Sequence, residues 1–357
     1  MTLAVPNRTP HALRVAAVER LCDDAVALTF EIPGDLADRY AFRPGQSLTL
    51  RRLVDGRDER RSYSICSPAG GAPRVGVREV PGGLFSSWLV REVRPGDEIE
   101  VLPPGGSFTN DLEPGSHHVM IAAGSGITPV LSVAASALAV PGTHVTLLYG
   151  NRTSDTVMFA DELADLKDAH PDRLHLVHVL SREVREPEIL TGRLDAAKLR
   201  TLLPLLVPVD EVDHWWLCGP HGMVTDAMDV LAGMDVPRDR VHRELFYVED
   251  APPPVRERPA AGPTGPSTPV TVVLDGRTTA VDLPAGATVL DGAQRVRPDL
   301  PFACKGGVCG TCRAKVTQGR VKMRRNYALD PAEVDAGFVL TCQSEAVGEP
   351  VTVDFDA

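Results

Sequence analysis

Apolar and polar positions alternate in short segments over the first hundred residues. The apolar runs are separated by Pro-Gly pairs, which favour tight turns. Short strands at this spacing are typical of an antiparallel β-barrel, and the pattern predicts such a domain over residues 1–113. The runs occupy residues 25–32, 47–50, 74–80 and 98–102.

From about residue 115 the pattern changes to continuous apolar runs that alternate with longer helical stretches. Strands buried on both faces have such continuous runs, so the pattern predicts βαβ units around a parallel sheet, an α/β domain over 114–249. Strands are expected at 119–123, 145–149, 174–180 and 215–218, and helices near 128–139, 156–169, 193–203 and 221–232.

Residues 250–269 are rich in proline and poor in bulky apolar side chains. Such a segment cannot pack a core, and we expect an extended linker there. It separates the two domains from a C-terminal domain at 270–357, so the chain is multidomain. Strands are expected there at 270–274, 278–283, 314–316 and 351–355, with a helix at 288–296.

Composition and charge narrow the class of protein. The chain of 357 residues is 43% apolar and 24% charged, which is ordinary for a folded protein. A net charge of −11 argues against nucleic-acid or membrane-surface partners. No apolar run approaches the roughly 18 residues of a membrane span, and the N-terminus lacks the apolar segment of a secretory signal. We therefore expect a cytoplasmic protein.

Four of the seven cysteines lie in the last fifth of the chain, at the spacing C-x4-C-x2-C-x29-C. This is the spacing of plant-type [2Fe–2S] ligands. Glycines within the loop allow the backbone to approach the sulfurs. A four-cysteine zinc site is the alternative, but it normally uses paired C-x2–4-C hooks. The predicted metal ligands are Cys304, Cys309, Cys312 and Cys342.

The loop Cys304–Cys312 together with Cys342 resembles the plant-type ferredoxins, and the likeness covers about 270–357. The resemblance implies a β-grasp fold that carries one electron on a [2Fe–2S] cluster.

Two motifs in the predicted barrel carry groups that suit a flavin. In Arg61-Ser62-Tyr63-Ser64, an arginine can pair with phosphate, a tyrosine can stack on a flat ring, and a serine can hydrogen-bond to a ring nitrogen. An ordinary strand edge explains this motif equally well. The second motif opens a predicted helix whose free N–H groups could bind phosphate. It contributes Val77, Arg78, Gly83, Leu84, Phe85 and Ser86.

Together these two motifs resemble the flavin-binding barrel of the ferredoxin–NADP reductase family. The resemblance implies bound FAD, with the first motif on the isoalloxazine and ribityl phosphate and the second on the pyrophosphate.

Between a predicted strand and helix lies G-S-G-I-T-P, with Gly124, Gly126, Thr128 and Pro129. Glycines at such a turn let a pyrophosphate approach the helix N-terminus. The reductase family carries the same motif, and there its threonine lies where nicotinamide meets flavin. The strand that ends in Cys218-Gly219-Pro220 also matches, with the cysteine bordering the nicotinamide; core packing is the alternative. By this resemblance Ser64, Thr128 and Cys218 would position the reacting rings.

Basic residues at two strand ends bear on the choice of nicotinamide cofactor. Arg152 follows the second strand of the α/β domain, and Ser181-Arg182 follows the third. An acidic residue there would favour NADH, whereas Arg and Ser can hold a 2′-phosphate. The pattern favours NADPH, with NADH as the alternative and two solvated arginines as the structural explanation.

Aromatic and histidine residues give weaker indications. In relatives an aromatic residue near the end of this domain packs on the flavin, so Phe246 is a candidate, and core packing explains it equally well. The histidines at 117, 118, 175, 178 and 214 lack a matched carboxylate spacing, so no metal is assigned to them.

The combined cofactors suggest a function. A flavin accepts two electrons from a nicotinamide and can pass them singly to an iron–sulfur cluster. The segments 323–334 and 337–344, with the domain order, resemble the reductase subunits of phenylacetyl-CoA epoxidases. That likeness implies a reductase that serves a multisubunit diiron oxygenase. The alternatives are a reductase of another oxygenase, of ring-hydroxylating, steroid or alkane type, and a zinc-stapled binding protein without redox chemistry.

Overall fold

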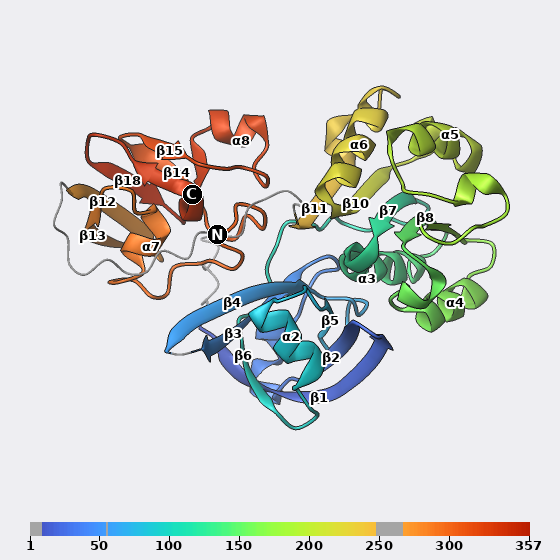
Figure 1. The fold of residues 1–357 in the computed structure, drawn as a ribbon, viewed down its shortest axis with the longest axis horizontal. Helices are drawn as coiled ribbons and strands as arrows, with labels where there is room; N and C mark the ends of the chain where they lie inside the picture. Colours follow the sequence, from blue (N-terminus) through green and yellow to red (C-terminus); the bar gives the residue numbers. More distant parts are fainter. Residues whose placement is uncertain (1–8, 55, 248–266) are drawn as a thin grey trace. The chain divides into compact units, whose positions relative to one another are not determined.

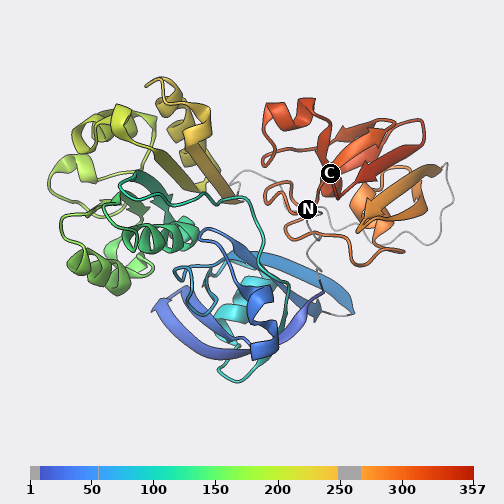
Figure 2. The ribbon, with the colours of Figure 1, turned by 180° about the vertical axis from the view of Figure 1, so that it is seen from behind.

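The computed structural model describes residues 9–54, 56–247 and 267–357. The chain divides into two compact units, of which one is Pro10–Glu249 and the other contains residues 267–357 (Figures 1 and 2). Two sheets lie in the first unit and two in the second. Across the described ranges, no helix combines the length and the apolar character needed to cross a membrane.

The first sheet is the predicted antiparallel barrel. Its strand order is β4-β3-β6-β1-β2-β5, and an isolated bridge between Ile65 and Val75 links the end of β4 to β5. Seventeen apolar side chains, from Leu13 to Val101, fill its interior. Its strands and helices are β1 His11–Cys22, β2 Ala25–Glu31, α1 Ala37–Tyr40, β3 Ser47–Val54, β4 Arg57–Ser64, β5 Arg74–Arg78, α2 Leu84–Arg91 and β6 Glu98–Val101.

Strands β1 and β4 were not among the predicted apolar runs. Strand β4 reads RDERRSYS, so the R-S-Y-S motif forms the end of this strand. The strand forms because it pairs along its whole length with β3, and because its charged side chains are paired, both within the strand and with β3. Asp58 accepts from Arg51 at 3.0 Å and from Arg60 at 2.8 Å.

The second sheet is parallel, with strand order β11-β10-β7-β8-β9. In chain order this is the 3-2-1-4-5 type of arrangement of doubly wound folds, and the order reverses between β7 and β10. Ligands of such folds bind outside the carboxyl ends of the strands at this reversal. The elements are β7 His117–Ala123, α3 Ile127–Leu138, β8 His144–Asn151, α4 Ala160–Ala169, β9 Leu174–Leu180, α5 Ala196–Leu206, β10 His214–Pro220, α6 His221–Ala232 and β11 Val241–Tyr247.

The strand β11 is a fifth strand of this sheet, beyond the four that the sequence predicts. It runs parallel to β10, with Cys218 opposite Glu244. Its sequence VHRELFY mixes polar and apolar residues because it is an edge strand, so it lacks the continuous apolar run of a central one.

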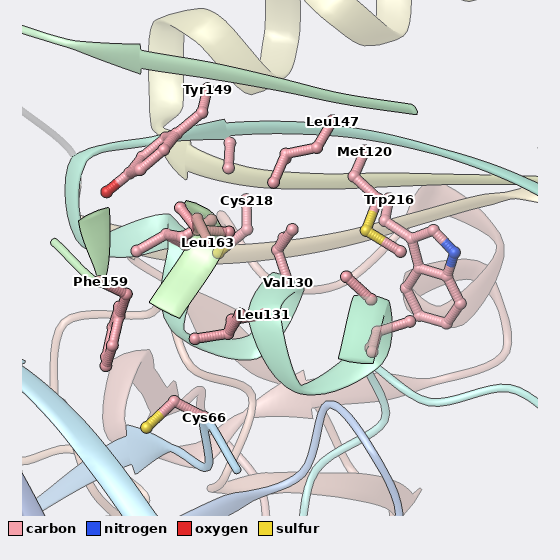
Figure 3. Packing of buried hydrophobic residues seen from close by; sticks show 14 of the residues in the cluster. Cys66, Met120, Val130, Leu131, Leu147, Tyr149, Phe159, Leu163, Trp216 and Cys218 are labelled. Atoms are coloured by element: carbon pink, nitrogen blue, oxygen red, sulfur yellow. The ribbon is translucent and has the colours of Figure 1, made fainter. Parts of the chain in front are cut away.

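Helix α3 packs into the core of the parallel sheet. Eleven of its twelve residues are buried, among them Val130 and Leu131. Figure 3 shows these side chains with Cys218, Leu163 and Trp216, which come from other elements. The start of α3 is therefore held firmly beside the ends of β7 and β10.

The C-terminal unit has a sheet of order β13-β12-β18-β14-β16 and a two-stranded sheet of β15 and β17. The four predicted strands and the helix are present, and β12 begins at Ser267, inside the segment predicted as linker. The remainder of that segment, 250–266, lies outside the described residues. The elements are β12 Ser267–Leu274, β13 Arg277–Pro284, α7 Val289–Ala293, β14 Arg313–Gln318, β15 Val321–Met323, α8 Pro331–Asp335, β16 Phe338–Leu340, β17 Ser344–Ala346 and β18 Val351–Asp354.

Candidate functional site

The loop between α7 and β14 gathers three of the four clustered cysteines. The backbone N–H groups of Gly306 and Cys309 donate to Cys304 Sγ at 3.3 and 3.4 Å. Gly307 and Gly310 have φ angles of 81° and 67°, which side-chain-bearing residues rarely adopt. The loop therefore wraps around a sulfur with its N–H groups turned inward.

The fourth cysteine meets this loop from the β16 end. Thr341, next to Cys342, donates from both its N–H and its hydroxyl to the Cys312 carbonyl, at 3.1 and 2.9 Å. Cys312 and Cys342 are 3% and 5% exposed. All four thiols are free of disulfides. Cys304 contacts Cys309 and Cys312 contacts Cys342, so the thiols meet in pairs that come from two segments of the chain.

Hydrogen bonding within the group shifts the pKa values of these thiols in opposite directions. Hydrogen bonds from the Cys309 side chain and from backbone N–H groups lower the pKa of Cys304 to about 5. Hydrogen bonding to Cys342 and burial raise the pKa of Cys312. A cysteine binds metal as the thiolate, so any of these thiols that is protonated would lose its proton when metal binds. The donor set fits an iron–sulfur cluster.

Gln343 is a residue of this site that the sequence analysis missed. Its Nε2 donates to the carbonyls of Lys305 and Cys342 at 2.8 and 3.0 Å, and lies 3.7 Å from Cys342 Sγ. It therefore ties the cysteine loop to the fourth cysteine. A polar residue directly after a ligand, within an otherwise buried segment, is the signal that could have identified it.

A second group of polar side chains lies where the barrel meets the parallel sheet. Ser64, at the end of β4 and 3% exposed, donates to Glu244 Oε2 at 2.9 Å. Glu244 comes from β11, whose backbone pairs with β10 at Cys218. The structure thus brings two predicted residues, Ser64 and Cys218, to one carboxyl group.

Glu244 was not predicted as a functional residue. Burial raises the pKa of its carboxyl group to about 7, and the Ser64 hydrogen bond partly offsets this. Such a group exchanges a proton near neutral pH. Burial and the neighbouring Glu244 raise the pKa of the Cys218 thiol well above its usual range, so this thiol stays protonated. No local motif marks Glu244, because its partner Ser64 is 180 residues away.

Gly126 allows the turn before α3 to touch the end of β10. A Cβ at this position would lie 2.1 Å from the Cys218 carbonyl oxygen. Glycine is therefore required for the contact between the G-S-G-I-T-P turn and the Cys-Gly-Pro segment. These two segments flank the reversal of strand order, where the free N–H groups of α3 could meet a dinucleotide.

Thr128 lies at the contact between the same helix and the barrel. It is 1% exposed, and its hydroxyl donates to the Ser125 carbonyl at 3.0 Å. A Cβ at Gly76 of β5 would lie 2.5 Å from Thr128 Cγ2. Pro129 is buried in the first turn of α3, and Gly219 and Pro220 end β10.

Of the other predicted barrel residues, Gly83 and Ser86 shape the turn into α2, and Val77 and Phe85 lie in the barrel core. A Cβ at Gly83 would meet Ser86 Oγ at 2.6 Å and the Val80 carbonyl at 2.8 Å, so the turn into α2 requires glycine. Ser86 Oγ accepts from the Val80 N–H at 3.0 Å. The side chains of Val77 and Phe85 belong to the barrel core, which leaves only their backbones to face a ligand.

Four other predicted flavin residues lie near the surface or against neighbours. Tyr63 packs on Phe85 with ring centroids 6.2 Å apart, and Arg61 pairs with Glu59 at 3.3 Å. Leu84 and Phe246 are 42% and 37% exposed.

A pocket of about 300 Å³ lies at the ends of β8 and β9. Arg152 and Arg182 both line it, and the Arg182 N–H donates to the Arg152 carbonyl at 2.8 Å. Ser181 precedes Arg182 at the end of β9. Two guanidinium groups at one pocket form a surface that suits a phosphate. The carboxylates of the pocket come from the β1–β2 turn and from Asp155.

Three families match successive parts of the chain. The oxidoreductase FAD-binding domain matches residues 12–110, the oxidoreductase NAD-binding domain 120–229, and the 2Fe-2S iron-sulfur cluster binding domain 272–347. These matches confirm the predicted order of a flavin barrel, a nicotinamide domain and a ferredoxin. FAD, a nicotinamide cofactor and a [2Fe–2S] cluster are therefore its cofactors.

Relatives share this arrangement over their full length. The chain is 42% identical to the E subunit of the 1,2-phenylacetyl-CoA epoxidase of Escherichia coli, over 98% of each chain. It is 34% identical to the 3-ketosteroid-9-alpha-monooxygenase ferredoxin reductase component of Rhodococcus rhodochrous, over 99% of each.

Two solved structures have a similar fold. Full-length CYP116B46 from Tepidiphilus thermophilus is 28% identical with a TM-score of 0.64, covering 99% of this chain and 43% of that chain. Phthalate dioxygenase reductase, at 24% identity and a TM-score of 0.62, covers 97% and 98% and shares the fold. The chain belongs to the family of NAD(P)H-dependent flavin and iron–sulfur oxidoreductases that includes the reductase subunits of phenylacetyl-CoA epoxidase.

Proposed function

We propose that this chain is the reductase component of a phenylacetyl-CoA epoxidase and passes electrons from NADPH to a multisubunit diiron oxygenase. The likeness to the E. coli protein, at 42% identity over 98% of each chain, carries this proposal. When bound, FAD accepts a hydride and hands single electrons to the [2Fe–2S] cluster. The chain supplies binding, orientation and protonation.

Residues Cys304, Cys309, Cys312 and Cys342 are the proposed cluster ligands. The support is their grouping and the N–H groups aimed at Cys304 Sγ. N–H groups directed at cluster sulfurs tune the reduction potential, so the loop would both hold the cluster and set its potential.

The barrel motifs are proposed to hold FAD, and the turn before α3 the nicotinamide dinucleotide. Gly83 and Gly126 support this, because each forms a turn that a Cβ would block. Arg152, Ser181 and Arg182 are proposed to receive the 2′-phosphate of NADPH. The shared pocket of the two arginines supports this choice over NADH.

Glu244 is proposed to hold a proton at the Ser64 hydroxyl. Its pKa of about 7 and its 2.9 Å hydrogen bond to Ser64 support this role. Glu244 would supply or accept a proton at the Ser64 hydroxyl, beside the flavin that Ser64 is proposed to hold. Thr128 and Cys218 would define the walls of the same space.

Reconstitution tests the proposal. Holoprotein titrated anaerobically with NADPH should bleach the flavin and cluster absorbance, and NADH should do so at a higher concentration. Added to the oxygenase subunits of a phenylacetyl-CoA epoxidase, it should support epoxide formation from phenylacetyl-CoA. Cluster reduction without epoxide formation would contradict the partner but leave the reductase assignment standing.

A steroid oxygenase is the second candidate partner. The 34% identity over 99% of the Rhodococcus reductase favours it. Parallel assays with phenylacetyl-CoA and 3-ketosteroid oxygenases would separate the two, because only the cognate partner should couple NADPH oxidation to product.

We also propose a cytoplasmic location. All seven cysteines are free thiols, as expected for a protein of a reducing compartment.

A further inference from the structure

The turn between β1 and β2 of the barrel supplies a carboxylate to the pocket that contains Arg152 and Arg182. Asp24 Oδ2 lies 3.2 Å from Arg152 Nη2, and Asp24 Oδ1 lies 3.1 Å from Arg78 Nε. Each carboxylate oxygen thus has one guanidinium partner. Asp24 comes from the flavin barrel and Arg152 from the nicotinamide domain, so this ion pair joins the two domains.

The two partners of Asp24 are held differently. The Arg78 side chain is 16% exposed, and its Nη2 also donates to the Thr156 carbonyl and to Cys22 Sγ. The Arg152 side chain is 49% exposed. Burial would raise the pKa of Asp24, but Arg78 and Arg152 lower it overall, so the carboxylate is ionised at neutral pH. Arg78 is therefore the enclosed partner of Asp24, and Arg152 is the partner that a ligand can reach.

A phosphate and a carboxylate compete for the same face of a guanidinium group, because both bind its N–H donors in the same geometry. If Arg152 turns to a 2′-phosphate, Asp24 loses one partner and keeps Arg78. No charged group is then left buried without a partner, which keeps the cost of the exchange small. NADH carries no 2′-phosphate, so it offers Arg152 no anion that could replace Asp24.

We propose that Asp24 is a specificity-determining residue that occupies Arg152 in the free enzyme and is exchanged for the 2′-phosphate of NADPH. This rests on the proposed role of Arg152 and Arg182 in NADPH binding. Asp24 lowers the affinity for 2′-phosphorylated ligands and sets the ratio between the two nicotinamides. Asp24 belongs to the barrel and Arg152 to the nicotinamide domain. The ratio of the affinities for the two nicotinamides therefore depends on how these two domains pack against each other.

The test uses the full-length holoprotein and two probes that differ only in the phosphate, adenosine 2′,5′-bisphosphate and AMP. Calorimetry gives the affinity ratio between them. Asp24→Asn keeps an oxygen for Arg78 but removes the charge, and should raise this ratio by about three- to fivefold, as expected for a partly exposed ion pair. If this variant loses FAD, Asp24→Ser replaces it.

A neighbouring carboxylate offers a matched control. Asp23 lines the same pocket, whereas the ion pairs with Arg78 and Arg152 are both made by Asp24. Asp23→Asn removes the same charge and should shift the ratio far less than Asp24→Asn. Equal shifts in both variants would overturn the proposal, because they would show a general field effect.

Arg152→Gln separates this inference from the function on which it rests. Arg152→Gln should lower the ratio of the affinities for adenosine 2′,5′-bisphosphate and AMP. Adding Asp24→Asn to Arg152→Gln should change this ratio no further, because Asp24 acts through Arg152. If Arg152→Gln leaves the ratio unchanged, the 2′-phosphate role of Arg152 fails. If Arg152→Gln lowers the ratio but Asp24→Asn does not raise it, the role of Asp24 alone is overturned.

Discussion

The cysteine loop and the junction between barrel and parallel sheet are built in opposite ways. The loop takes three thiols from one short segment, and its glycine φ angles and N–H···S contacts set their positions. The junction takes Ser64 from β4, Cys218 from β10 and Glu244 from β11, with 180 residues between the first and the last. One site depends on local backbone geometry, and the other depends on three elements packing in register.

The two sites should therefore differ in how strongly changes elsewhere in the protein affect them. A local loop should tolerate changes elsewhere and fail only when a ligand is lost. A site assembled from distant strands should respond to small changes of packing, because a shift of a few tenths of an ångström moves one wall relative to another.

The largest effect is expected for Cys309→Ser. Loss of a cluster ligand should reduce electron transfer to the oxygenase by about 100-fold or more, while NADPH still reduces the flavin within about twofold of the normal rate. Stopped-flow absorbance of flavin and cluster bands measures both. Cys66→Ala, which removes a thiol outside the loop, is the control. Slowed flavin reduction in Cys309→Ser would mean that the two sites are not independent.

Gly126→Ala should damage the junction. The new Cβ would lie 2.1 Å from the Cys218 carbonyl, so the turn before α3 must move. We expect flavin reduction by NADPH to slow by about tenfold or more and stability to fall by roughly 1–3 kcal/mol. The control is Gly222→Ala in α6, where a Cβ meets nothing within 4 Å. Equal effects of the two substitutions would contradict a close approach at Gly126.

Glu244→Gln should change the pH dependence of stability. The folded pKa of about 7 exceeds the ordinary value of 4.5, so between these pH values the unfolded chain releases a proton that the folded chain keeps. Stability of the natural protein therefore falls as pH rises through this range, by roughly 1–3 kcal/mol. Melting curves from pH 5 to 9 should show a smaller fall for Glu244→Gln. Parallel curves for both proteins would refute the raised pKa.

Gln343→Leu should give the smallest effect. Removing the amide donor near Cys342 Sγ should lower the cluster reduction potential by about 30–60 mV, since one weak hydrogen bond contributes roughly 0.7–1.4 kcal/mol and 59 mV is tenfold for one electron. Redox titration followed by electron paramagnetic resonance measures it. Gln318→Leu, on the exposed end of β14, should leave the potential unchanged. An unchanged reduction potential in Gln343→Leu would show that Gln343 only holds the loop and does not tune the cluster.

The sequence predicted best what is encoded locally. The cysteine spacing, the turn at Gly124–Gly126 and the apolar central strands each depend on neighbouring residues. The strand β4 was missed because its stability comes from pairing with β3, and β11 because it is an edge strand. Glu244 and Asp24 were missed for one reason: their partners, Ser64 and Arg152, come from distant segments.

The environment of Cys22 is another feature that the sequence does not predict. Its thiol donates to Asp24 at 3.3 Å, and the residue lines the pocket that contains Arg152 and Arg182. Cys66, in contrast, is fully buried. Only the fold separates the environments of these two residues.

The position of β11 has a practical consequence for dividing the protein. The NAD-binding match ends at residue 229, and a truncation placed there would remove both β11 and Glu244. It would also turn β10 into an open edge that presents unpaired backbone groups to other chains. A flavin–nicotinamide fragment should therefore extend through Tyr247, so that it stays monodisperse and keeps Glu244.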